Sequence, residues 1–283
     1  MVVSIVVPVF RNAQTIHELY HQVDELFKER NDVELELYFI DDGSDDDSLE
    51  KIHIITSQDV RVRYLSFDKN YGQVAAIVAG LRVCSGDAAV VMSADLQDPI
   101  AKIEEMIECW KRGASIVICY RKSREDKWLD RFFSSVFYGL IKLIYPSIPH
   151  GGFDYFLLNR SCIDEFNEID RVGRFLQGDV VKLNGNKVFL SYARLARAFG
   201  KSQWTFSRKV NYAKVALFYQ DRVARILGAC FFLLGCISIA LSHYKIGLVF
   251  FLSLVWIVFI AYRSKKQQRN RKIQLYYRVE RQS

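Results

Sequence analysis

The sequence predicts an α/β domain built on a doubly wound, mostly parallel sheet, followed by a membrane-spanning hairpin of two helices. Three observations support this prediction. Short β-type runs alternate with helical segments over the first 120 residues, and acidic residues follow the second and fourth runs. Two long apolar stretches lie near the end of the chain. Alternating strands and helices form parallel sheets, because each helix returns the chain to the same end of the sheet.

Apolar periodicity locates the elements of this sheet. Strands are predicted at residues 2–10, 33–40, 60–66, 88–93 and 115–120, and helices at 13–30, 46–57, 72–84 and 100–112. Neither G-x-G-x-x-G nor G-x-x-x-x-G-K-[ST] follows the first strand, so neither a dinucleotide dehydrogenase nor a P-loop enzyme is supported. Ligands of doubly wound sheets bind beyond the carboxyl ends of the strands, which makes those loops the first candidates for a site.

Acidic residues at two of these strand ends suit a divalent cation or a ribose. Asp41 and Asp42 follow the second strand, and Asp95 follows the fourth. Alternate residues of a sharp strand exit point to the same side, so Asp95 and the carbonyl group of Gln97 are candidates to share one Mg²⁺ or Mn²⁺.

Each acidic run also has a purely structural interpretation. Asp98 precedes Pro99 at the start of a predicted helix, and we assign Asp98 mainly to the N-cap of that helix. Taken alone, Asp41 and Asp42 fit a turn followed by a helix cap equally well. Asp95 is assigned mainly to function.

The net charge of +7 is unevenly distributed along the chain. Residues 1–110 carry 9 Lys and Arg against 21 Asp and Glu, residues 111–262 carry 22 against 10, and residues 263–283 carry 8 against 1. An acidic part, a basic part and a basic tail require separate explanations, so nucleic-acid binding is a poor summary of this charge.

The cysteines and the first residues indicate a cytosolic domain. Six cysteines are scattered without a C-x-x-C pair, which is typical of reduced cysteines that bind no metal. The apolar run at residues 2–8 lacks a preceding basic segment and is interpreted as a buried strand, not as a signal peptide.

Residues 226–244 and 246–262 contain no Asp, Glu, Lys or Arg, and only Lys245 separates them. Each is close to the roughly 20 residues needed to span a bilayer, so a tight transmembrane hairpin is predicted; the alternative is a pair of buried core helices. Basic residues flank the hairpin on both sides, which by the positive-inside rule places both termini and the N-terminal domain in the cytoplasm. The basic tail is expected to lie against anionic headgroups.

Four segments, SIVVPVFRN, FIDDGSDD, DKNYGQVAAIVAGL and SADLQDP, resemble in order and spacing the inverting GT-A glycosyltransferases of family 2. The chain is most similar there to the polyprenyl-phosphate glycosyltransferases, which include dolichol-phosphate mannose synthases and undecaprenyl-phosphate sugar transferases. The resemblance continues through GGFDYFLLNR at 151–160 and YARLARAFGKSQW at 192–204 and covers nearly the whole chain. It implies transfer of a sugar from a nucleotide sugar to a polyprenyl phosphate at the cytoplasmic face, in cell-envelope polysaccharide assembly.

The resemblance also assigns roles to residues. It implies nucleotide binding by Pro8, Phe10, Asp41, Asp42 and Lys69, metal binding by Asp95 and Gln97, and acceptor-phosphate binding by Arg121, Arg131, Ser135 and Arg197. Asp95 and Asp154, the latter an isolated acidic residue in an apolar context, are the candidate catalytic residues. The chemistry agrees, because a departing diphosphate needs a cation, Mg²⁺ or Mn²⁺, and an acceptor phosphate needs arginine donors. Asp154 is expected to position its neighbours, since an anionic acceptor requires no strong base; the alternative is a satisfied buried carboxylate.

One position departs from the family pattern. The family usually has an acidic residue where this chain has Ser93, as the first member of an acid-x-Asp pair. Ser93 supplies no carboxylate, so metal binding is expected to be weaker or to depend on Asp95, Gln97 and the diphosphate. An alternative interpretation of Ser93 is that the chain is a catalytically inactive homologue.

Four parts are expected: a GT-A catalytic domain over 1–205, an amphipathic juxtamembrane interface helix over 206–225, the hairpin over 226–262 and a basic cytoplasmic tail over 263–283. The expected partners are a nucleotide sugar, a polyprenyl phosphate and the bilayer, without nucleic acid. The sequence is also compatible with a homo-oligomer, because small residues in the first predicted span allow close contacts between helices. Two alternative functions are a transferase acting on a lipid-linked oligosaccharide or glycan, and a catalytically dead membrane scaffold.

Overall fold

The computed structural model describes residues 1–121, 139, 141–142, 145–149, 151–169, 174–195 and 279–280. The chain divides into two compact units. Met1–Asp170, Leu176–Ser202 and Arg278–Ser283 form the first unit, and Arg171–Phe175 and Gln203–Tyr277 form the second. All the elements below belong to the first unit.

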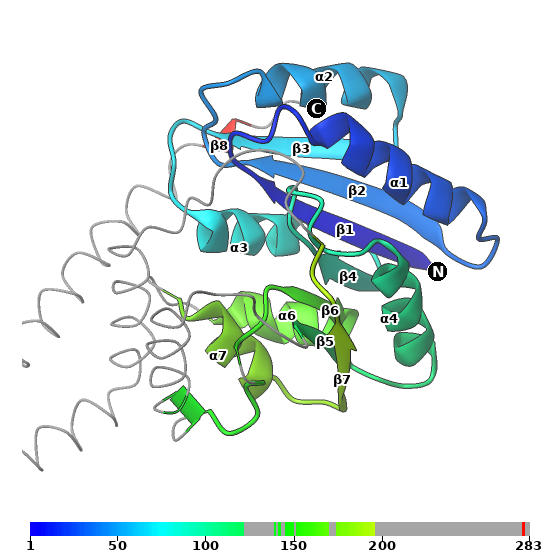
Figure 1. The fold of residues 1–283 in the computed structure, drawn as a ribbon, viewed down its shortest axis with the longest axis vertical. Coiled ribbons are helices and arrows are strands. Elements are labelled where there is room, and N and C mark those ends of the chain that lie inside the picture. The colour runs from blue at the N-terminus through cyan, green and yellow to red at the C-terminus, as the bar shows by residue number, and fades with distance from the viewer. Residues whose placement is uncertain are drawn as a thin grey trace, which may run out of the picture. The chain divides into compact units, whose positions relative to one another are not determined.

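The described strands form one sheet with the order β7-β5-β6-β4-β1-β2-β3-β8 (Figure 1). The strands are β1 (Val2–Val9), β2 (Glu34–Asp41), β3 (Val62–Phe67), β4 (Ala88–Val91), β5 (Ile116–Arg121), β6 (Tyr155–Asn159), β7 (Lys187–Tyr192) and β8 (Val279–Glu280). Strands β1 to β4 pair in parallel, as do β5 and β7, whereas β6 is antiparallel to β4 and β5. Strand β8 is antiparallel to β3. The predicted mostly parallel sheet is confirmed.

Helices cover both faces of the sheet, as a doubly wound fold requires (Figure 1). The helices are α1 (Ile16–Lys28), α2 (Ser48–Gln58), α3 (Gln73–Val83), α4 (Ala101–Lys111), α6 (Arg160–Glu168) and α7 (Leu176–Lys182). Helices α1, α2 and α4 share one hydrophobic core with the sheet. On the other face, α3 packs against β1 and β2 and also contacts α6. A side chain at Gly80 of α3 would overlap Val6 and Ile40, so glycine there permits the close approach of this helix.

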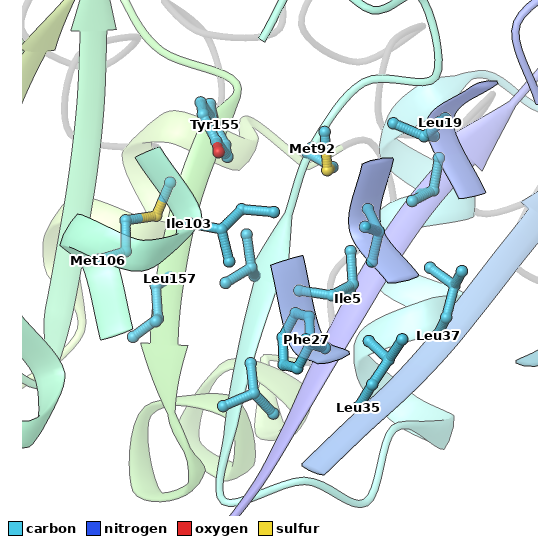
Figure 2. Packing of buried hydrophobic residues seen from close by; sticks show 14 of the residues in the cluster. Ile5, Leu19, Phe27, Leu35, Leu37, Met92, Ile103, Met106, Tyr155 and Leu157 are labelled. Carbon is cyan, nitrogen blue, oxygen red and sulfur yellow. The ribbon is translucent and has the colours of Figure 1, made fainter. Parts of the chain in front are cut away.

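The core between the sheet and α1, α2 and α4 is formed by alternate residues of the strands. Ile5 of β1 and Leu37 of β2 are fully buried on the same face as Phe27 of α1 (Figure 2). Ile103 and Met106 of α4 complete this cluster beside β4 and β6. Burial of each such side chain stabilises the fold by about 1.5–3 kcal/mol.

Pro8 explains where β1 and β4 stop pairing. The last paired residues are Val6 and Val91, followed by a bond from the N–H group of Met92 to the carbonyl group of Val6. The next bond of a parallel ladder would need an N–H group at residue 8, which proline lacks. The chain after β4 therefore leaves the sheet at this point.

All nine elements predicted before residue 121 are present, with ends that differ by a few residues. The antiparallel strand β6 was not predicted: residues 155–159 were read only as part of a family motif. The predicted interface helix at 206–225 and the hairpin at 226–262 lie outside the described residues. Within the described residues, no helix combines the length and apolar character needed to cross a membrane.

Candidate active site

The carboxyl ends of β1, β2, β3, β4, β5 and β7 lie at one edge of the sheet, because these strands run in the same direction. Strand β6 runs the opposite way, so Asp154, which precedes it, reaches the same edge. Among the described residues, two non-glycine residues have left-handed φ angles, Arg11 (56°) and Leu96 (58°), and both lie in loops at this edge. Strained backbone of this kind concentrates at functional sites. This edge is therefore the candidate active site.

Asp41 ends β2 and is nearly fully buried. Its carboxylate accepts hydrogen bonds from the hydroxyl group of Ser66 at 2.9 Å and from the N–H group of Ser44 at 3.2 Å. These donors stabilise a buried negative charge at the end of the central strands. The prediction that Asp41 lines a nucleoside pocket is compatible with this position.

Asp42 holds the loop that leads into α3. Its carboxylate accepts hydrogen bonds from the N–H groups of Tyr71 at 2.7 Å and Gly72 at 2.8 Å, and from the side chain of Asn70 at 2.9 Å. The side chain of Asp42 thus organises the loop, while the exposed Lys69 in the same loop lies with its Nζ 5.3 Å from the ring centroid of Tyr71.

Gly43 fits closely against this loop. It has a φ of +67°, and a Cβ atom there would lie 2.5 Å from the carbonyl carbon of Lys69 and 2.9 Å from the amide nitrogen of Asn70. Both the backbone conformation and the close approach favour glycine. The Asp-Asp-Gly sequence therefore sets the spacing between the loops after β2 and β3.

The loop after β1 is attached to the loop after β2 by Arg11. The guanidinium group of Arg11 donates to both oxygens of Asp45, at 2.5 and 2.6 Å, and the backbone N–H group of Arg11 donates to Ser44 Oγ at 3.0 Å. The guanidinium carbon lies 5.2 Å from the ring centroid of Phe10, so cation–π attraction adds to the ion pair. Phe10 is half-buried at this edge, whereas Pro8 is buried within β1.

Asp98 holds both ends of the loop after β4, which we call the 93–98 loop. It is buried and accepts hydrogen bonds from the N–H group of Ser93 at 3.0 Å and from the hydroxyl group of Tyr192 at 2.9 Å. The prediction that Asp98 caps the next helix is wrong, because α4 has Ile100 as its N-cap and the Asp98 oxygens bond elsewhere. Burial and the nearby carboxylate of Asp154 raise the pKa of Asp98 to about 6.

Asp95 and Gln97 both contact the residues that follow β7. The N–H group of Leu195 donates to the Gln97 carbonyl oxygen at 3.0 Å, and Gln97 Nε2 donates to the Leu195 carbonyl oxygen at 3.1 Å. Asp95 Oδ1 accepts from the Gln97 N–H group at 3.3 Å, and Asp95 Oδ2 lies 3.6 Å from Arg194 Nη2. The structure therefore brings Asp95 and Gln97 together, and it gives the Gln97 carbonyl group a protein donor.

A divalent cation fits this loop only with additional ligands from a substrate. Among the described residues, no cluster of three or more His, Cys, Asp or Glu side chains is placed to hold a metal ion. Mg²⁺ commonly binds through one or two carboxylates together with substrate phosphates and water. Asp95 is suited to supply one such carboxylate, while Asp98 already holds the backbone of the loop.

Arg121, the last residue of β5, forms an ion pair with Asp154, the residue before β6. Nη2 of Arg121 lies 3.1 and 3.0 Å from the two carboxylate oxygens of Asp154. Burial opposes the charge of Arg121, but Asp154 and Tyr192 keep the pKa of this guanidinium group above its ordinary value. Arg121 at the end of β5 is also in register with Tyr192 at the end of β7.

The structure thus places nine of the twelve predicted site residues at or beside this edge. Arg131, Ser135 and Arg197 lie outside the described residues. Reasoning from the sequence missed Tyr192 and the true partners of Asp98. Tyr192 is the first residue of the motif at 192–204, and nothing local in the sequence indicates a bond to a residue 94 positions away.

A doubly wound sheet with a carboxylate-bearing loop beyond β4 is the arrangement of GT-A folds. Comparison with solved structures agrees: the chain is similar to glucosyl-3-phosphoglycerate synthase from Mycobacterium tuberculosis, solved with Mn²⁺, uridine-diphosphate-glucose and phosphoglyceric acid. The two share 17% sequence identity with a TM-score of 0.53, and the match covers 77% of each chain. At this identity the similarity supports the fold.

The family model of glycosyl transferase family 2 matches residues 4–166, and the chain belongs to this family. The chain is 35% identical over 206 residues to the bactoprenol glucosyl transferase of Shigella phage SfV, which covers 72% of this chain and 67% of the relative. It is 31% identical over 211 residues to a putative glycosyltransferase of Bacillus subtilis, covering 74% of this chain and 64% of that relative. The chain thus spans about two thirds of the length of these relatives.

Proposed function

We propose that this chain is an inverting glycosyltransferase that moves a sugar from a nucleotide sugar to a polyprenyl phosphate at the cytoplasmic face of a membrane. One observation carries the proposal: the loop with Asp95 and the Arg121–Asp154 pair lie at the same edge of the sheet, so that groups suited to a cation and to a phosphate lie together. The similarity to a bactoprenol glucosyl transferase supports a lipid acceptor.

In the proposed reaction, an oxygen atom of the acceptor phosphate attacks the anomeric carbon of the donor sugar. The bond from that carbon to the donor diphosphate breaks, the nucleoside diphosphate leaves, and the configuration inverts. The acceptor is already an anion, so no strong general base is required. Holding the two reactants in line is then the main task of the protein.

The residues of this chain divide that task. Arg121 is suited to bind the acceptor phosphate, because a guanidinium group offers planar, permanently charged donors, and Asp154 fixes its orientation. Asp95 would hold a divalent cation, which when bound supplies positive charge to the leaving diphosphate. Arg131, Ser135 and Arg197 remain proposed acceptor ligands, and the hairpin at 226–262 remains the proposed membrane anchor.

The proposal is tested with membranes that contain the full chain. These membranes are incubated with polyprenyl phosphate, Mn²⁺ and each of a set of labelled nucleotide sugars, and the chloroform-soluble label is counted. We expect one donor to give a product that mild acid cleaves to a single sugar. A larger glycan released by acid would instead indicate transfer to a lipid-linked oligosaccharide.

Two variants sharpen the test. Asp95→Asn should lower transfer by about 100-fold or more, the size of effect seen when one electrostatic contact to a developing charge is lost. Asp87→Asn is the matched control, because Asp87 accepts a hydrogen bond from the N–H group of Val2 at the opposite edge of the sheet. No labelled lipid from any donor, or full activity in Asp95→Asn, would overturn the proposal.

A further inference from the structure

The last residue of β7 and the three residues after it contact every acidic or amide side chain of the 93–98 loop. We call residues 192–195 the strap. Tyr192 bonds to Asp98, Arg194 lies beside Asp95, and Leu195 exchanges two hydrogen bonds with Gln97. The strap and the loop are almost 100 residues apart in sequence, so these contacts are a product of the fold.

Tyr192 is the one strap residue whose side chain is fully enclosed. It is 3% exposed, and its ring packs edge-on against Tyr155, with centroids 5.8 Å apart. The Tyr155 hydroxyl group in turn donates to the carbonyl oxygen of Pro99 at 3.1 Å. The Tyr192 hydroxyl group therefore has a fixed direction, toward the carboxylate of Asp98.

Asp98 connects the hydroxyl group of Tyr192 to the backbone of the loop. One oxygen of its carboxylate accepts from Tyr192, and the other accepts from the N–H group of Ser93. The two bonds fix both ends of a loop in which Leu96 has a φ of 58°, a conformation that side-chain-bearing residues adopt only when their surroundings hold them. Asp95 lies within this strained turn.

Tyr192 also lies beside the acceptor half of the site. It is in register with Arg121, the residue paired with Asp154. We propose that Tyr192 is a positioning residue that, through Asp98, holds Asp95 in place for the donor and its cation. Tyr192 thereby also links the donor half of the site, which contains Asp95, to Arg121 in the acceptor half. The inference rests on the proposed function, because it concerns how the donor is held.

The proposal is tested with Tyr192→Phe in the full chain, which removes one hydroxyl group and keeps the buried ring. Tyr20→Phe is the matched control: Tyr20 also donates to a carboxylate, Asp59, at 3.0 Å, but beside the amino end of β3 at the opposite edge. Hydrogen exchange of the peptide that contains the 93–98 loop is measured in both variants. Loss of one hydrogen bond to a charged group predicts about tenfold faster exchange in Tyr192→Phe alone.

The second readout is nucleotide binding, measured by calorimetry with nucleoside diphosphates at a series of Mn²⁺ concentrations. We expect Tyr192→Phe to raise the half-saturating Mn²⁺ concentration about tenfold, and Tyr20→Phe to leave it unchanged. Unchanged exchange in the 93–98 loop, or faster exchange with unchanged Mn²⁺ dependence, overturns the inference. If the wild-type chain binds no nucleoside diphosphate, the proposed function fails, and the exchange rates alone decide whether Tyr192 holds the loop.

Discussion

Replacing Gly43 by alanine tests the close contact between the loops after β2 and β3. Two costs add. Alanine at a φ of +67° costs about 1 kcal/mol relative to glycine. The new Cβ atom would also lie 2.5 Å from the carbonyl carbon of Lys69, and this neighbour is backbone that cannot rotate away. Forcing an extra methyl group into packed surroundings costs about 1–3 kcal/mol more. The expected loss in the free energy of unfolding is therefore about 2–4 kcal/mol.

The chain contains a glycine that separates these two costs. Gly113 follows α4 with a φ of +97°, and a Cβ atom there would meet no heavy atom within 4 Å. Gly113→Ala should therefore lose only the conformational part, about 1 kcal/mol. Urea unfolding of the full chain in detergent, followed by tryptophan fluorescence, measures both variants against the wild type. Equal losses in the two variants would refute the claim that the loops are in close contact at Gly43.

Three further predictions concern stability and metal binding. A hydrogen bond from Arg61 holds the pKa of Asp59 at about 2, so the stability that this carboxylate adds is complete above pH 4 and disappears as the pH falls toward 2. Asp59→Asn should therefore lower the free energy of unfolding at pH 7 by about 1–2 kcal/mol, allowing for solvent screening, and have little effect at pH 2; an equal loss at both pH values would contradict this. Ser93→Asp adds a carboxylate two positions before Asp95 and should lower the half-saturating Mn²⁺ concentration about fivefold in nucleotide-binding titrations, whereas an unchanged value would exclude residue 93 from the cation site. Ile103→Ala leaves a cavity between α4 and the sheet and should cost about 2–5 kcal/mol in urea unfolding, and a loss below 1 kcal/mol would mean that the core closes around it.

The parallel half of the fold was predictable because its signals are local. The strands β1 to β5 are short apolar runs, and the helices between them show the spacing of one buried face. Strand β6 was different. Residues 155–159 are a short buried run outside the alternation of strands and helices that identified the earlier strands, and the place of β6 between β4 and β5 depends on pairing with residues far away in sequence.

The candidate site shows the same limit. Asp41, Asp42 and Asp95 were found because acidic residues at strand ends are visible in the sequence. Asp98 was misassigned because a helix cap is a local interaction, and the Asp-Pro pair is a strong local signal. In the folded chain the carboxylate of Asp98 instead accepts a hydrogen bond from the hydroxyl group of Tyr192.

The antiparallel direction of β6 has a consequence for how such a protein changes over evolution. Strand β5 ends and strand β6 begins at the same edge of the sheet, so residues 122–154 leave from the candidate site and return to it. Insertions, deletions or wholesale exchange of this segment would alter what surrounds Arg121 while the register of every strand stays the same. The sheet would thus tolerate changes in this segment without any change in the pairing of β1, β2 and β4, the strands that precede the loops with Asp41, Asp42 and Asp95.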